Sequence, residues 1–185
     1  EWFFSNNFAN PNHWNQAFMV KTPPLDIEKL QASIVKLIEQ HDVFRLRYIQ
    51  FEDTTLYSQY YQDKVQAEKL KVLDIRTIEG NQDSEKFAIE LQKILTNWQS
   101  SFNIVNGPVY NIGYLYGYED GSARIVIAMH HLLVDSVSWR IITEDLRDIY
   151  YGKKLDPKGS SYRQWSDVIT NYTQNNSNEQ SYWQN

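Results

Sequence analysis

An unbroken apolar run at residues 125–129 limits the folds open to this chain more than any other feature. A strand with one face in water alternates apolar and polar residues, so a run without alternation predicts a strand that is covered on both faces. The segment Glu-Asp-Gly-Ser at 119–122 joins it to a preceding apolar segment at 109–118 and is typical of a hairpin turn. We therefore predict a sheet in which residues 123–129 form a central strand.

Helical and extended patterns alternate around this hairpin. Helical spacing of apolar residues, with Asp26 and Ser84 as capping residues, predicts helices at 27–40, 84–100, 137–151 and from 162 onward. Further strands are predicted at 15–20, which ends before Pro23-Pro24, at 44–51, where apolar and polar residues alternate, and at 56–61 and 70–73, with a turn at 52–54. This order predicts an α/β fold with a mixed, mainly antiparallel sheet and helices packed on it.

The strand predicted at 44–51 has a specific expected orientation. Phe44, Leu46 and Tyr48 alternate with Arg45 and Arg47. This alternation is typical of a half-buried strand, so we expect the three apolar side chains on the inner face and the two arginines on the outer face.

Composition excludes several classes of function. The 185 residues fit one domain or one lobe of a larger one, and a net charge of −5 without a basic run argues against a nucleic-acid partner. The chain has no cysteine, which excludes disulfides and thiolate metal sites and fits a reducing cytoplasm. No apolar run is long enough for a membrane span, and no signal peptide is visible. The first residue is Glu1 rather than Met, so we expect a piece of a longer protein.

Two adjacent histidines follow the central strand. His130 and His131 stand at its end, and Asp135 comes four positions later, directly before a helix. Adjacent side chains on an extended backbone point in opposite directions, so one ring should face the core and the other an open cavity. A histidine titrates near neutral pH, so the cavity-facing ring can move a proton.

Residue chemistry alone leaves several interpretations of this segment open. Both histidines can be ordinary core residues. A metal site is possible, but adjacent histidines do not easily chelate one ion and no third ligand is evident. The His130 to Asp135 spacing also fits the H-x-x-x-x-D pattern of glycerolipid acyltransferases. The remaining interpretation is acid/base catalysis on an acyl or aminoacyl thioester.

The segment HHLLVDSVSWRII at 130–142 resembles the signature H-H-x-x-x-D-G of the condensation-domain superfamily of nonribosomal peptide synthetases. It is more similar to the epimerization-type version, H-H-x-x-x-D-x-V-S-W, because Ser136 replaces the usual Gly and Val-Ser-Trp follows. Other segments resemble motifs of epimerization domains in the same order along the chain. They lie at 2–3, 12–16, 41–48, 102–108, 161–165 and 182–183.

The resemblance implies a fold and an activity. The fold is a lobe like chloramphenicol acetyltransferase, with residues 1–185 as the N-terminal lobe of a two-lobe domain whose second lobe supplies a carboxylate across a channel. The activity is conversion of an L-aminoacyl or peptidyl thioester to the D form by proton exchange at Cα. The substrate is carried on the phosphopantetheine arm of a peptidyl carrier protein, with no cofactor or metal in the lobe itself. The second lobe and the other synthetase modules are the further implied partners.

The resemblance also implies roles for individual residues. His131 is the acid/base residue, and His130 is structural, with its ring hydrogen-bonded in the core. Asp135 is structural and pairs with Arg45, which matches the family's pairing arginine, while Arg47 is a competing partner.

The helix that begins at Ser136 offers one more role. The backbone N–H of Ser136 can stabilise a negative oxygen near the thioester carbonyl, or Ser136 is a plain N-cap residue. Trp139 and Trp14 are expected to pack in the core. Two other functions stay open: a condensation lobe that forms an amide between two carrier-bound substrates, and a catalytically silent lobe that docks a carrier protein.

Overall fold

The computed structural model describes residues 2–6, 8–51, 57–64 and 67–184. The chain divides into two compact units, Glu1–Lys154 and Leu155–Asn185. The strands all lie in the first unit: β1 (Asn15–Thr22), β2 (Leu46–Gln50), β3 (Tyr57–Tyr61), β4 (Lys71–Asp74), β5 (Tyr110–Tyr116) and β6 (Ala123–His130). Its α-helices are α1 (Trp2–Ser5), α2 (Ile27–Gln40), α3 (Glu85–Gln99) and α4 (Ser136–Tyr150). Short 3₁₀ turns lie at Pro11–His13, Asp42–Arg45 and Ile75–Thr77.

The main sheet has the strand order β1-β6-β5-β4. Strand β6 pairs antiparallel with both β1 and β5, and β4 runs parallel to β5. The predicted central strand and the predicted mixed, mainly antiparallel sheet are therefore confirmed. Strands β2 and β3 form a separate antiparallel pair.

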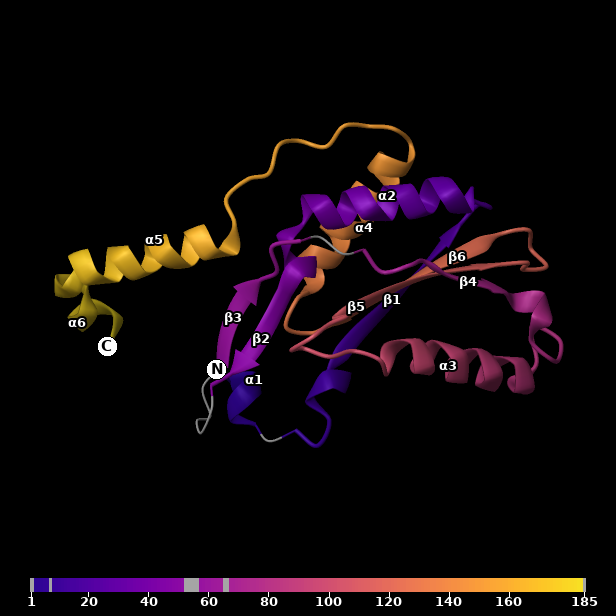
Figure 1. The fold of residues 1–185 in the computed structure, drawn as a ribbon, viewed down its shortest axis with the longest axis horizontal. Helices are drawn as coiled ribbons and strands as arrows, with labels where there is room; N and C mark the ends of the chain where they lie inside the picture. Colours follow the sequence, from indigo (N-terminus) through magenta and orange to yellow (C-terminus); the bar gives the residue numbers. More distant parts are fainter. Residues whose placement is uncertain (1, 7, 52–56, 65–66, 185) are drawn as a thin grey trace. The chain divides into compact units, whose positions relative to one another are not determined.

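Helices cover both faces of the main sheet (Figure 1). On the α3 side, Phe87 belongs to a buried cluster with Leu115 of β5 and Val126 of β6. The α2 and α4 helices pack on each other and bury the apolar stripes that predicted them, for example Leu30 and Leu146. Because both faces are covered, β6 needs apolar side chains at successive positions, which explains its unbroken run.

A close approach between α3 and the sheet depends on a glycine. Gly113 of β5 lies under the indole of Trp98, and a Cβ added there would lie 2.9 Å from Trp98 Cε3 and closer still to Cζ3. The side-chain amide of Asn111 also donates to the backbone oxygen of Trp98 at 2.9 Å. The last turn of α3 is therefore seated on β5 through a position where only hydrogen fits.

The predicted strand at 44–51 is correct in part. Phe44 and Arg45 belong to a 3₁₀ turn, and the strand begins at Leu46. The expected outer position of Arg47 is wrong: the residue is 6% exposed, and its guanidinium donates to the backbone oxygens of Phe44 and Leu46. Gly107 makes room for it, because any Cβ there would collide with the guanidinium. The predicted turn at 52–54 and the start of the next strand at residue 56 lie outside the described residues.

The predicted helix caps are confirmed. The Asp26 side chain accepts from the Lys29 amide at 2.7 Å, and the Ser84 side chain accepts from the Phe87 amide at 3.2 Å. In the hairpin turn, Gly121 has φ of 70°, a conformation that glycine adopts without a steric cost.

The second unit consists of α5 (Tyr162–Asn175), a 3₁₀ turn (Ser177–Glu179) and α6 (Gln180–Trp183). Ser161 and Gln164 form a reciprocal capping box at the start of α5. The apolar stripe of α5, which includes Trp165 and Ile169, is exposed in this chain. In the described part of the chain, every helix is too short or too polar to cross a bilayer.

Candidate active site

The two histidines at the end of β6 have opposite environments. His130 is completely buried, and its ring packs edge-on against Phe3 with centroids 5.4 Å apart. Its Nε2 lies 2.8 Å from the Pro11 backbone oxygen, and its Nδ1 accepts from the Leu132 amide at 3.2 Å. Burial, the largest cause, lowers the pKa of His130 below its ordinary value of 6.5, and His131 nearby acts in the same direction. A neutral ring with one donor and one acceptor nitrogen satisfies both partners.

His131 is the exposed member of the pair. It occupies the turn after β6, where its backbone amide donates to the Trp14 backbone oxygen at 2.8 Å. Its ring lies nearly parallel to the Trp14 indole, with centroids 6.2 Å apart, and its Nδ1 is 3.2 Å from the Val134 backbone oxygen. The prediction that one ring faces the core is therefore confirmed for His130, while the prediction that the other ring faces an open cavity stays a prediction for the exposed His131.

Gln16, which has no predicted chemical role, contacts this ring, and Trp139 contacts Gln16. Gln16 of β1 places its amide nitrogen 3.2 Å from His131 Nε2. Its amide oxygen accepts from Trp139 Nε1 at 3.0 Å. Trp139, expected to be a packing residue, is only partly buried, and its ring also stacks on Phe18 with centroids 5.8 Å apart. Only the pairing of β1 with β6, in which Gln16 lies opposite Met129, brings Gln16 beside the histidine loop.

The expected ion pair between Asp135 and Arg45 is absent among the described residues, and Arg47 does not replace it. Asp135 is exposed and is the N-cap of α4, where its carboxylate accepts from the backbone amide and the hydroxyl of Ser138 at 2.8 and 2.6 Å. Those hydrogen bonds, first the hydroxyl and then the amide, hold the pKa of Asp135 below 3.8. Arg45 instead pairs with Asp42 at 2.7 Å. The physical reason is distance along the chain: each charge finds a partner three residues away, at little cost in conformational entropy.

Ser136 is the first residue of α4, and the cap is Asp135 rather than Ser136 itself. The interpretation of Ser136 as the N-cap is therefore wrong. The Asp135 carboxylate already occupies the positive end of this helix. A role for the Ser136 amide toward a negative oxygen stays a prediction.

The histidine loop is held by contacts other than an ion pair. The Leu133 amide donates to the His130 backbone oxygen at 2.9 Å, which closes a tight turn. The Tyr48 hydroxyl of β2 reaches the Leu132 backbone oxygen at 3.4 Å. Together with the buried His130 ring, these bonds fix the backbone that carries His131.

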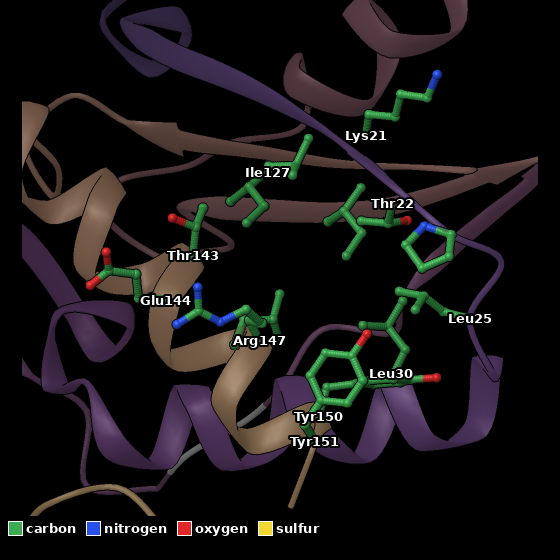
Figure 2. Close-up of a pocket in the computed structure, with 14 residues that line it drawn as sticks. Lys21, Thr22, Leu25, Leu30, Ile127, Thr143, Glu144, Arg147, Tyr150 and Tyr151 are labelled. Atoms are coloured by element: carbon green, nitrogen blue, oxygen red, sulfur yellow. The ribbon is translucent and has the colours of Figure 1, made fainter. Parts of the chain in front are cut away.

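A pocket of about 360 Å³ lies at the other end of α4 (Figure 2). It is bounded by β1, β6, α2 and α4, with Ile127 and Leu30 on its apolar walls and Thr143 and Arg147 projecting from α4. His131 does not line it. Within the described residues, no group of three or more His, Cys, Asp or Glu side chains is placed to hold a metal ion.

The chain has an α/β fold that presents one exposed imidazole directly after its central strand. The sequence profile of the Condensation domain family matches residues 1–185, so the chain belongs to that family. It is 40% identical over 183 residues to N-(5-amino-5-carboxypentanoyl)-L-cysteinyl-D-valine synthase of Penicillium rubens, covering 99% of this chain and 5% of the synthase. It is 39% identical over 173 residues to the synthase of the same name from Amycolatopsis lactamdurans, covering 94% of this chain and 4% of that synthase. The chain therefore spans only a small part of the length of these relatives.

Solved structures support the same fold class. The epimerization domain from the third module of tyrocidine synthetase B superposes with a TM-score of 0.77 at 29% identity, covering 98% of this chain and 42% of that one. The starter condensation domain of rhizomide synthetase superposes with a TM-score of 0.71 at 18% identity, covering 94% and 42%, which shows the fold alone. The predicted α/β fold with helices packed on a mainly antiparallel sheet is confirmed.

Proposed function

We propose that this chain is the N-terminal lobe of an epimerization domain in a nonribosomal peptide synthetase. The substrate is an L-aminoacyl or peptidyl thioester on the phosphopantetheine arm of a carrier protein, and the product is its D form. His131 is the acid/base residue. The observation that carries this proposal is the contrast between the two adjacent histidines. His130 is completely buried and fixes the loop, and His131 projects from that loop into solvent.

Three observations favour epimerization within the family. Residues 137–139 read Val-Ser-Trp, which resembles the epimerization-type signature. A similar solved structure is an epimerization domain. The Penicillium synthase has a D-valine in the name of its product.

The proposed reaction is a proton exchange at Cα. A thioester acidifies the Cα–H bond, and the Nε2 lone pair of His131 takes that proton while the electron pair moves onto the thioester oxygen as an enolate. A proton delivered to the opposite face of Cα then restores the thioester with inverted configuration. The Ser136 amide at the start of α4 is the proposed donor to the enolate oxygen. We assign the opposite-face acid to a carboxylate of the second lobe.

The competing function is condensation, in which His131 assists attack of a carrier-bound amine on a second carrier-bound thioester. The match of the whole chain to the Condensation domain family favours it. A silent lobe that only docks a carrier protein is the third possibility, for which no change in activity would follow from loss of His131.

The deciding experiment uses the intact synthetase with its carrier loaded with an L-aminoacyl group that bears deuterium at Cα. Loss of deuterium and the D:L ratio are followed by mass spectrometry and chiral chromatography. We expect label loss with formation of D product in the wild type, and at least a 100-fold slower exchange in His131→Ala, the size of effect that general acid/base catalysis supplies.

His13→Ala is the matched control, because His13 is also an exposed histidine and lies in the 3₁₀ turn Pro11–His13. It should exchange label at the wild-type rate. Retention of deuterium, together with amide formation when a second loaded carrier is added, would assign the lobe to condensation. Exchange of deuterium at the wild-type rate in His131→Ala would show that His131 is not the acid/base residue.

A further inference from the structure

The contacts of His131 specify which of its two nitrogens carries the proton. Trp139 Nε1–H is a donor only, so the Gln16 atom 3.0 Å from it must be the amide oxygen. The other end of that amide, the NH₂ group, therefore faces His131 Nε2 at 3.2 Å. An NH₂ group only donates, so Nε2 must accept through its lone pair.

The other side of the ring leads independently to the same assignment. His131 Nδ1 lies 3.2 Å from the backbone oxygen of Val134, which only accepts. Nδ1 must therefore carry the proton. Both lines of contact select the neutral tautomer with hydrogen on Nδ1 and the lone pair on Nε2, and the hydrogen bond at one ring nitrogen generally sets the state of the other.

We infer that Gln16 and Trp139 are positioning residues that hold His131 in this tautomer, so that Nε2 is the atom that receives the substrate proton. The inference rests on the proposed role of His131. Trp139 anchors the Gln16 amide in one orientation, and the anchored amide keeps a donor facing Nε2. This gives the Val-Ser-Trp segment at 137–139 a physical function, because Trp139 orients the Gln16 amide and that amide orients the His131 ring.

Gln16→Glu and Gln16→Leu give opposite expectations for the reactivity of His131. A carboxylate at position 16 accepts from Trp139 with one oxygen and presents an acceptor to Nε2 with the other, so the ring takes a second proton and loses its lone pair. Leucine presents no polar atom and leaves the lone pair uncovered. If Gln16 had a purely steric role, Gln16→Leu should disturb the reactivity of His131 more than Gln16→Glu, because Glu is closer in shape to Gln than Leu is.

The first test measures carbethoxylation by diethyl pyrocarbonate at each histidine of the intact synthetase by peptide mass spectrometry. This reagent reacts with a histidine only through an unprotonated ring nitrogen. We expect His131 to react roughly 5-fold faster in Gln16→Leu, the factor that one neutral hydrogen bond represents. In Gln16→Glu it should react about 10-fold slower, because a charge-assisted bond is stronger. His41, whose Nε2 is 2.7 Å from Asp145 of α4, reports whether α4 is still packed and should not change.

The second test compares turnover of carrier-bound substrate in Trp139→Phe and Phe18→Leu. Trp139→Phe keeps an aromatic ring but removes the N–H, and we expect kcat to fall about 5-fold with KM within twofold. Phe18→Leu removes the ring stacked on Trp139 and leaves the N–H, so kcat should stay within twofold of the wild type.

The outcomes separate this inference from the proposed function. Equal carbethoxylation of His131 in the wild type and both Gln16 variants would overturn the inference, even in an enzyme that epimerizes through His131. The predicted opposite changes would support it, even in an enzyme that forms amides instead of D products. Equal loss of kcat in Trp139→Phe and Phe18→Leu would assign Trp139 to packing and also overturn it.

Discussion

Replacing Gly113 by alanine tests how α3 is seated on the sheet. The added methyl group would lie 2.9 Å from Trp98 Cε3 and closer still to Cζ3, so the indole or the strand must shift. Overpacking of this kind costs about 1–3 kcal/mol. Alanine has less backbone entropy than glycine in the unfolded chain, and this difference stabilises the folded protein by about 0.4–1 kcal/mol. We therefore expect a net loss of about 1–2 kcal/mol in the local free energy of unfolding.

Native-state hydrogen exchange of β5 and α3 peptides in the intact protein measures this loss directly. Gly159→Ala is the matched control, because a Cβ there meets no atom within 4 Å, and it should change stability by less than about 0.5 kcal/mol. A Trp98→Leu background removes the clash, so Gly113→Ala should cost at least about 1 kcal/mol less there. Equal protection in the wild type and Gly113→Ala, or the same cost in both backgrounds, would refute the reasoning.

Three further predictions concern buried polar groups and the α4 cap. Burial lowers the pKa of His130 below 6.5, so the unfolded chain binds a proton that the folded lobe excludes. Its contribution to stability is complete above pH 6.5 and declines as the pH falls toward the lowered folded pKa, by at most about 1.4 kcal/mol per pH unit. Denaturant titrations between pH 7.5 and about 5 should show this decline in the wild type, and the decline should be absent in His130→Gln. Asp135→Ala should reduce hydrogen-exchange protection at the start of α4, whereas Asp135→Asn keeps a capping oxygen and most of the protection. The effects of Asp135→Ala and Arg45→Gln on stability should be additive in the double variant. A strong energetic coupling between the two substitutions would instead indicate an ion pair between Asp135 and Arg45. Tyr114→Phe should cost about 1–2 kcal/mol by hydrogen exchange of β5, because the Leu25 amide loses its acceptor at 2.7 Å, and an unchanged value would mean that water replaces the hydroxyl.

Local patterns predicted the elements of the fold well, because they depend on neighbours in sequence. The unbroken apolar run predicted the central position of β6, and the capping residues Asp26 and Ser84 predicted where two helices begin. The opposite environments of His130 and His131 also followed from the geometry of an extended backbone.

Alternation failed at Arg47 for a physical reason. The pattern placed its charge in water, but a guanidinium can be buried when backbone oxygens accept its hydrogen bonds and a glycine leaves space beside it. Those oxygens belong to Phe44 and Leu46, and the space is supplied by Gly107, about sixty positions along the chain.

Periodicity in the sequence predicted most of the strands and helices, and the geometry of adjacent residues predicted that the rings of His130 and His131 point in opposite directions. The support of the site depends on contacts between residues far apart in the chain, which local patterns do not encode. Gln16 contacts a ring 115 positions away, and its other partner, Trp139, is 123 positions away, so no local pattern could connect the three. Strand register brings Gln16 to the end of β6, and the packing of α4 brings Trp139 to Gln16. The same structure gives Asp135 to the α4 cap rather than to Arg45, because a carboxylate bonds to the nearest well-oriented donors.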